Sequence, residues 1–250
     1  MAIVCKSPAE IEKMRSSGRI LRQVLDAVRD AIAPGVSTMD LERVAEKKII
    51  EMGATPAFKG YHGYPCVLCT SVNNEIIHGI PSDKRVLQED DIISVDCGVV
   101  LDGYYADSAF TVAVGNHVRP DVEKLLKVTE ESLYRAIEQA RVGKTVGDIG
   151  SAVQRHVEAA GFSVVREFVG HGIGTRMHEE PSVPNYGTPG YGAKLREGMV
   201  LAIEPMVNIG KPDARVLDDD WTAVTVDGTF SAHFEHSVAI TKDGPVVLTQ

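Results

Sequence analysis

The spacing of apolar side chains predicts two consecutive pairs of amphipathic helices, each pair followed by strands. The first helix begins at a capping sequence from Ser7 to Glu10, has a proline at its first position and ends before Pro34. Its apolar residues recur at every third or fourth position. Residues 64–114, and the part of the chain after residue 160, favour strands joined by tight turns. The expected helices cover residues 7–34, 37–53, 120–141 and 146–160.

The second helix pair repeats the first at a fixed offset of 108 residues. Every capped amphipathic helix shares part of this pattern, but here the register holds from residues 35–53 to residues 143–161. We therefore expect one catalytic domain over residues 1–250, built from two related α+β halves of roughly 1–115 and 116–250, with a site at their junction. The corresponding positions are Gly35, Ser37, Asp40, Leu41, Ile49 and Gly53 in the first pair, and Gly143, Thr145, Asp148, Ile149, Val157 and Gly161 in the second.

Composition and charge exclude several classes of protein. The chain of 250 residues is long enough to bury a substantial core, and its formal net charge is −9. With that charge and no run of lysine and arginine among aromatic residues, the sequence argues against a nucleic-acid surface. No segment approaches the ~18 consecutive apolar residues of a membrane span. The first ten residues also lack the pattern of a secretory signal, so we expect a cytoplasmic protein without nucleic-acid or membrane partners.

The four cysteines do not form a zinc motif. Cys66 and Cys69 form a C-x-x-C pair, but Cys5 and Cys97 do not supply a second ligand pair at a suitable spacing. We expect free thiols that are packed or line a pocket, as is usual in a reducing cytoplasm.

Four acidic residues interrupt apolar segments that otherwise favour strands. A single acid of this kind is compatible with a position that faces solvent. Burying an unpaired carboxylate costs several kcal/mol, so buried acids are normally paired with a base or bound to a metal. None of the four segments contains an arginine or a lysine, and together they predict a cation site. The four acids are Asp96, Asp107, Glu204 and Glu235.

The Asp-Gly sequence at residues 102–103 predicts a two-residue type I′ turn. In that register Asp107 pairs with Gly98, and Asp96 pairs with Ala109. The two aspartates are then diagonal neighbours on one face, with Cα atoms roughly 7–8 Å apart. They can both reach a pair of ions about 3.5–4 Å apart, which is the separation in two-metal hydrolases. An oxygen-rich set with one imidazole suits Mn²⁺, Fe²⁺, Co²⁺ or Zn²⁺.

Five motifs resemble the methionine aminopeptidases of the M24 metallopeptidase family, and the similarity to the type I, bacterial-like group is close. It extends over essentially the whole chain. It implies a pita-bread fold, an α+β fold in which two pseudo-symmetric halves share an antiparallel sheet covered by helices. The type I assignment depends on the short separation of 31 residues between Glu204 and Glu235, where type II relatives carry a long insertion. The motifs are VDCGVVLDGYYADS, FVGHGIG, MHEEP, LAIEP and FEHS.

The resemblance implies a centre of two divalent metal ions, Co²⁺, Mn²⁺, Fe²⁺ or Zn²⁺. Asp107 and Glu235 would bridge the ions and Asp96 would chelate one of them. His171 and Glu204 would bind the other ion. A monovalent cation, Na⁺ or K⁺, is a further expectation near Asn73, Glu75 and Ser231.

The resemblance also implies roles at the substrate. His78 would hydrogen-bond near the scissile amide, and His178 would contact the scissile carbonyl, where a donor is typically worth a few kcal/mol. Glu204 would in addition carry the proton of the attacking water. The other histidines are assigned structural or surface positions by default: His62, His117, His156, His233 and His236.

The pocket for the first residue of the substrate should accept an unbranched thioether, because sulfur packs favourably against aromatic rings. Position 177 is usually aromatic in relatives, and here it is a methionine. Ordinary core packing is the alternative explanation for this set of side chains. The lining that the resemblance implies is Tyr61, Tyr64, Cys69, Met177 and Trp221, with Phe58 as a further candidate.

The function implied is hydrolysis by a monomeric cytoplasmic metalloprotease. It would remove the initiator methionine from nascent polypeptides near the ribosome when the second residue is small, by attack of a water or hydroxide that bridges the two metal ions. A first alternative is a proline-directed aminopeptidase or prolidase with the same ligands, although those enzymes usually carry an additional N-terminal domain. A second is an inactive pita-bread binding module, but such proteins tend to lose ligands. Residues 187–195 also lack the ending of a P-loop.

Overall fold

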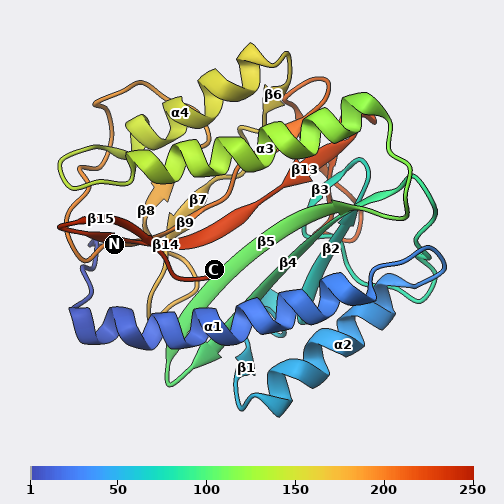
Figure 1. The fold of residues 1–250 in the computed structure, drawn as a ribbon, viewed down its shortest axis with the longest axis horizontal. Coiled ribbons are helices and arrows are strands. Elements are labelled where there is room, and N and C mark those ends of the chain that lie inside the picture. The colour runs from blue at the N-terminus through green and yellow to red at the C-terminus, as the bar shows by residue number, and fades with distance from the viewer. Residues whose placement is uncertain (1) are drawn as a thin grey trace.

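The four expected helices are present in the computed structural model, which describes residues 2–250 (Figure 1). Capping boxes at Ser7, Ser37 and Thr145 start three of them, as the sequence predicted. A short 3₁₀ turn, η1, covers Tyr61–Gly63. Within the described residues, no helix is both long and apolar enough to cross a membrane. The helices are α1 (Pro8–Ala31), α2 (Thr38–Glu51), α3 (Pro120–Gln139) and α4 (Val146–Ala159).

A nine-stranded antiparallel sheet forms the centre of the molecule. Its main path runs β1 (Thr55–Pro56), β4 (Ile92–Leu101), β5 (Tyr104–Ala113), β14 (Glu235–Thr241), β9 (Val200–Ile203), β7 (Gly170–Gly172) and β8 (Glu179–Val183). Off this path, β2 (Leu68–Val72) pairs with β4, and β15 (Gly244–Val247) pairs with β14.

Two three-stranded sheets complete the strand content of the described residues. The first has the order β13 (Ser231–His233), β10 (Met206–Asn208), β6 (Ser163–Val164). The second has the order β11 (Ala214–Val216), β12 (Ala223–Thr225), β3 (Glu75–Ile77).

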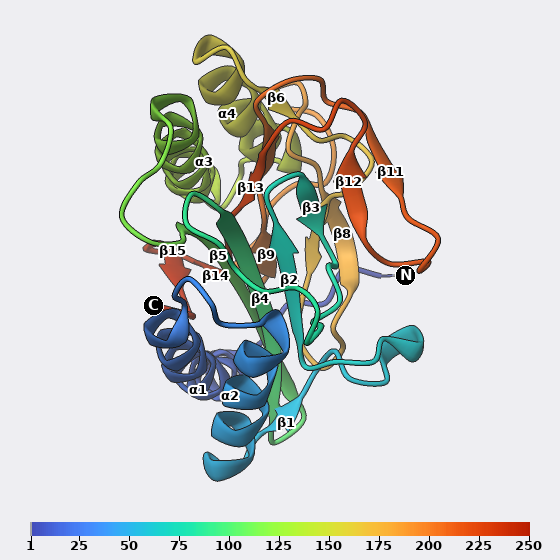
Figure 2. The same ribbon diagram turned by 90° about the vertical axis from the view of Figure 1, so that its right-hand side faces the viewer.

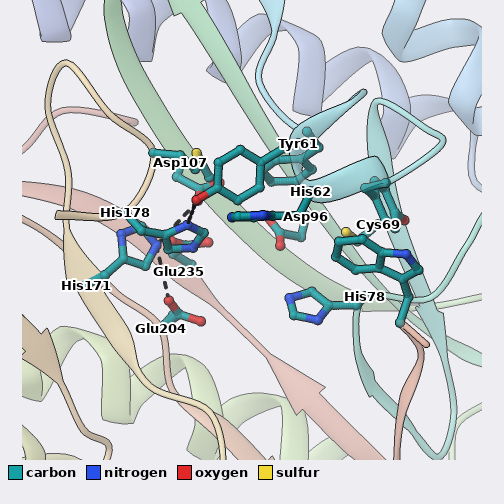
Figure 3. A pocket seen from close by; sticks show the side chains of 14 residues that line it. Tyr61, His62, Cys69, His78, Asp96, Asp107, His171, His178, Glu204 and Glu235 are labelled. Carbon is teal, nitrogen blue, oxygen red and sulfur yellow. Dashed lines mark hydrogen bonds and ion pairs between the residues drawn. The ribbon is translucent and has the colours of Figure 1, made fainter. Parts of the chain in front are cut away.

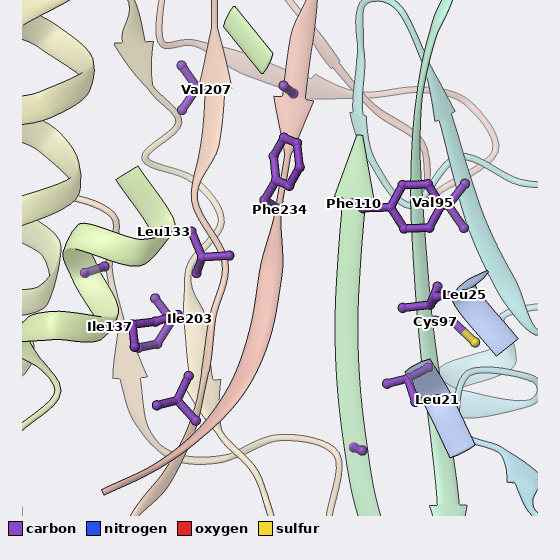
Figure 4. Close-up of a cluster of buried hydrophobic side chains, with 14 of the residues drawn as sticks. Leu21, Leu25, Val95, Cys97, Phe110, Leu133, Ile137, Ile203, Val207 and Phe234 are labelled. Carbon is purple, nitrogen blue, oxygen red and sulfur yellow. The ribbon is translucent and has the colours of Figure 1, made fainter. Parts of the chain in front are cut away.

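The helices cover one face of the central sheet. α1 packs on α2 and α3 on α4, and α1 also lies against β4 and β5. Figure 2 shows this helical layer on one side of the sheet and β3, β11 and β12 on the other. The main core fills the space between helices and sheet (Figure 4). Because side chains alternate along a strand, Val95 and Cys97 of β4 enter this core while Asp96 lies on the opposite face.

The two helix pairs make matching contacts at the predicted offset. Gly35 donates a backbone hydrogen bond to the Leu87 carbonyl at 2.8 Å, and 108 positions later Gly143 donates to the Leu195 carbonyl at 3.0 Å. Both glycines have a φ of 90°, a conformation that glycine adopts without strain. The division into halves near residue 115 stays a prediction.

Candidate metal centre and substrate pocket

The β4–β5 hairpin has the predicted register. The φ angles of Asp102 and Gly103 are 50° and 79°, as a type I′ turn requires. Asp96 pairs with Ala109, and the pairing of Gly98 with Asp107 follows two residues along. The two aspartates therefore lie on the same face of the sheet, and both reach the same pocket.

The neighbouring strand β14 adds a third acid to this face. Ala109 pairs with Asp96 on one side and with Glu235 on the other, so both acids flank one small residue. Alanine leaves the space above it to the two carboxylates.

A second row of paired residues brings in the histidine. The Ser237 side chain accepts from the backbone N–H of Asp107 at 3.0 Å and donates to its carbonyl at 2.9 Å. Ser237 pairs with Ala202 of β9, which pairs with His171 of β7. Glu204 follows β9 directly and, by period two, faces the same way as Ala202. The strand order thus joins residues that are far apart in the sequence.

The ligand atoms of Asp107, His171 and Glu235 all lie within 4.8 Å of one another, as one metal ion requires (Figure 3). His171 Nε2 lies 3.9 Å from Asp107 Oδ2 and 3.6 Å from Glu204 Oε1. Its Nδ1 lies 2.9 Å from the Gly172 carbonyl oxygen, which can only accept a hydrogen bond. The ring proton therefore sits on Nδ1, and the Nε2 lone pair faces the carboxylates, as in a metal ligand.

The electrostatics of the cluster fit a bound cation. Burial, together with repulsion between neighbouring acids, raises the pKa of Asp107, Glu204 and Glu235, and burial also raises the pKa of Asp96. Three buried carboxylate oxygens have no hydrogen-bond partner among the described residues, and divalent ions would satisfy all of them. They are Asp96 Oδ1, Asp107 Oδ1 and Glu235 Oε1.

An apolar pocket of about 480 Å³ opens beside this cluster. Trp221 packs edge-on against Tyr64 at 5.0 Å between ring centroids, and Tyr64 donates to the Leu68 and Gly79 carbonyls at 2.9 and 3.0 Å. The residues that line the pocket include every side chain expected at the substrate and all five expected metal ligands. Besides the ligands, its lining is Phe58, Tyr61, His62, Tyr64, Cys69, His78, Met177, His178 and Trp221.

Two of the lining histidines, His78 and His178, are those expected at the substrate. His178 lies 4.2 Å from His171 between ring centroids, and its Nδ1 is 2.7 Å from the Tyr61 hydroxyl oxygen. His78 has a φ of 61°, which is uncommon for a residue with a side chain and typical of functional sites. Burial lowers the pKa of His78 to about 4, so this ring is neutral near pH 7.

The turn that carries Met177 and His178 is anchored by a buried ion pair. Lys6 Nζ lies 2.7 Å from Glu179 Oε2, and Glu179 Oε1 accepts from the backbone N–H of Arg176 at 3.2 Å. Glu179 is therefore a support of this turn and lies outside the lining of the pocket.

Two histidines that were expected at structural or surface positions lie in this region. His62 lines the pocket and has a left-handed backbone conformation, with a φ of 47°. The nearby Gly60 and Gly63 were the feature of the sequence that pointed to an unusual backbone here. His233 is buried beside Glu204, with 3.9 Å between His233 Nε2 and Glu204 Oε2. Its place two residues before Glu235 was the signal, since alternate strand residues share a face.

The remaining predicted positions lie outside the pocket. The Ser231 backbone N–H donates to the Asn73 carbonyl at 2.8 Å, and Glu75 Oε2 accepts from the Val72 backbone N–H at 2.7 Å. All four cysteines are free, as expected, and Cys69 alone among them lines the pocket in the described part of the chain.

Comparisons with known proteins agree with this geometry. The family model of metallopeptidase family M24 matches residues 12–242. Methionine aminopeptidase of Clostridium perfringens is 51% identical over 247 residues, which cover 99% of this chain and 98% of that protein. The crystal structure of methionine aminopeptidase from Thermotoga maritima has a TM-score of 0.98 and 46% identity, with 100% of both chains covered.

The prolidase of Pyrococcus horikoshii is a more distant neighbour, with a TM-score of 0.78, 24% identity and 63% of that protein covered. At that identity the likeness shows the shared pita-bread fold alone. The chain therefore belongs to metallopeptidase family M24 and, within it, to the methionine aminopeptidases.

Proposed function

We propose that this chain removes the initiator methionine from nascent polypeptides whose second residue is small. The observation that carries the proposal is the convergence of four acids and one histidine beside an apolar pocket rich in sulfur and aromatic rings. The relatives named methionine aminopeptidase support it. The same proposal includes a monomer that acts in the cytoplasm, near the ribosome.

The five side chains that would hold two divalent ions are Asp96, Asp107, His171, Glu204 and Glu235. Co²⁺, Mn²⁺, Fe²⁺ and Zn²⁺ all suit this oxygen-rich set with one imidazole. When bound, such ions supply positive charge that polarises a peptide carbonyl and lowers the pKa of water. A monovalent cation beside Asn73, Glu75 and Ser231 is a further part of the proposal.

The protein side chains handle the protons and orient the substrate. Glu204 takes a proton from the attacking water and passes it to the leaving amine, which is general acid–base catalysis. The Tyr61 hydroxyl oxygen lies 2.7 Å from His178 Nδ1, and we assign the donor role to the hydroxyl, which places the ring proton of His178 on Nε2. His178 can then donate to the scissile carbonyl and to the oxyanion that develops there. His78, neutral near pH 7, binds the scissile amide.

The pocket selects the first residue of the substrate. Met177, Cys69 and Phe58 are buried in one cluster with the rings of Tyr64 and Trp221 packed against them. A long, unbranched thioether makes favourable contacts with such a wall. A charged or strongly polar first side chain would lose its hydration without gaining a partner.

A peptide panel tests the proposal. The metal-loaded protein should release methionine from Met-Ala-Ser and much more slowly from Met-Trp-Ser. It should release nothing from a peptide with a bulky first residue and proline second. Release from the proline peptide would instead support a proline-directed enzyme, and release from none, with metal bound, would support an inactive binding module.

A further inference from the structure

His233 is a buried histidine whose ring has no hydrogen-bond partner within residues 2–250. It is the last residue of β13, its side chain is 2% exposed, and neither Nδ1 nor Nε2 makes a hydrogen bond. A buried polar group without a partner costs free energy, so an unpaired ring beside an active site requires an explanation.

The backbone of His233 is fixed to the strand that carries Asp107. Its N–H donates to Thr111 Oγ1 at 2.9 Å, and Thr111 Oγ1 donates to its carbonyl at 2.7 Å. On the other side it pairs with Met206 of β10. The position of the ring relative to the acid cluster is therefore set by the sheet.

The two oxygens of Glu204 face two different histidines. Oε1 lies 3.6 Å from His171 Nε2, and Oε2 lies 3.9 Å from His233 Nε2. The first separation suits a carboxylate and an imidazole that share one ion, since each ligand bond is about 2.0–2.2 Å long. The second separation leaves Glu204 Oε2 facing the ring of His233, which carries one N–H proton and has no hydrogen-bond acceptor for it.

We propose that His233 is a positioning residue, whose Nε2–H donates to Glu204 Oε2 and so holds Oε1 toward the metal ion and the attacking water. This inference rests on the role proposed above for Glu204. The present separation must shorten by about 1 Å to form the hydrogen bond, and contacts of this kind often tighten when ligands bind. Partners that orient a metal ligand in this way typically change metal affinity or activity about 10–100-fold.

Two variants separate this role from simple packing. His233→Phe keeps an aromatic ring and removes the donor, whereas His233→Gln keeps a donor on a shorter side chain. We expect His233→Phe to lower kcat on Met-Ala-Ser about 10–100-fold with little change in KM. Calorimetric titration of the metal-free protein with Co²⁺ should show weaker binding to the same extent, and the visible spectrum of bound Co²⁺ should change. His233→Gln should recover most of both losses.

The inference would be overturned if His233→Phe kept the kcat, the Co²⁺ affinity and the Co²⁺ spectrum of the wild-type protein. Equal losses in both variants, with an equal fall in Tm, would also overturn it, because they would indicate packing of the imidazole alone. If His233→Phe does not fold, His233→Met fills the site without a donor and takes its place. A wild-type protein that releases no methionine would refute the proposed function, while the Co²⁺ titrations would still decide the role of His233.

Discussion

At the scale of residues, Tyr61 and His178 make a short polar contact beside the candidate metal ligands. The Tyr61 hydroxyl oxygen lies 2.7 Å from His178 Nδ1, and the His178 ring in turn packs edge-on against His171. Tyr61 also lines the pocket, so one side chain lies both where we propose that the substrate binds and within hydrogen-bond distance of His178.

Tyr61→Phe should weaken turnover without unfolding the protein. The substitution removes one hydrogen bond worth about 0.5–1.5 kcal/mol and leaves the ring in the pocket. We expect kcat/KM on Met-Ala-Ser to fall about 2–13-fold, with most of the loss in kcat, since the role proposed for His178 is at the transition state. Tyr191→Phe, at an exposed tyrosine, is the matched control. Equal kinetics for the two variants would contradict the role given to Tyr61.

Local geometry explains which site residues could be predicted. Asp96 and Asp107 follow from one Asp-Gly turn, because a two-residue loop fixes the register of its hairpin. His171 and Glu204 depend on the strand order β14–β9–β7, which no local pattern specifies. His171 was therefore predicted only through the resemblance, whereas Glu204 was singled out as an acid in an apolar segment and received its role as a ligand through the resemblance. The one local signal for His233 was its place two residues before Glu235, and the rest of its surroundings come from segments that are distant in the sequence.

At the scale of elements, the second helix of each pair begins with the same kind of capping box. Ser37 at the start of α2 and Thr145 at the start of α4 each accept from a backbone N–H three residues on, and an aspartate completes each capping box. Both caps are buried, so water does not replace the hydrogen bonds that a substitution removes.

Ser37→Ala and Thr145→Ala should destabilise the protein by similar amounts, about 1 kcal/mol each. For a chain of this size, that corresponds to a fall in Tm of about 2–4 °C. Ser182→Ala, at an exposed serine on β8, should leave Tm unchanged, and Thr145→Ser should retain the cap. The measurement is thermal unfolding followed by circular dichroism. If Thr145→Ala had the Tm of the wild-type protein, the cap at Thr145 would make no contribution to stability.

Boundaries of elements were also largely predictable, and the exceptions have a physical reason. The sequence extended the third helix to residue 141, whereas α3 ends at Gln139. Ala140 already leaves the helical conformation, with a ψ of 63°, three residues before Gly143. Short strands such as β10 and β13 were not individually predicted, because three residues carry no detectable alternation.

At the scale of the whole molecule, the sheet concentrates negative charge at one point. Four carboxylates from β4, β5, β14 and the end of β9 share one pocket, and their pKa values are all raised there. This repulsion opposes folding in the absence of a cation, so bound metal should stabilise the fold as well as the site.

Removal of metal should therefore lower the Tm of the protein. Neutralising two of the buried carboxylates should make the Tm independent of metal. At a concentration 100 times its Kd, an ion stabilises the fold by about 2.7 kcal/mol, or about 5–10 °C here. We expect Mn²⁺ or Co²⁺ to raise the Tm of chelator-treated wild type by that amount. The double variant Asp96→Asn, Asp107→Asn should be more stable than wild type without metal and should not respond to it. An equal response in both proteins would place the bound ions elsewhere.

The five converging side chains are proposed to form the metal centre with which this chain hydrolyses an N-terminal methionyl peptide bond. The most direct measurement is methionine release from Met-Ala-Ser by metal-free protein, by the same sample after Mn²⁺ or Co²⁺ is restored, and by metal-loaded Glu204→Gln. Glu197→Gln, at an exposed acid, is the control. We expect no release from metal-free protein, rapid release from metal-restored wild type and from the control, and a kcat for Glu204→Gln that is lower by about 10²–10⁴-fold. Release by the metal-free protein, or at the wild-type rate by Glu204→Gln, would contradict the claim.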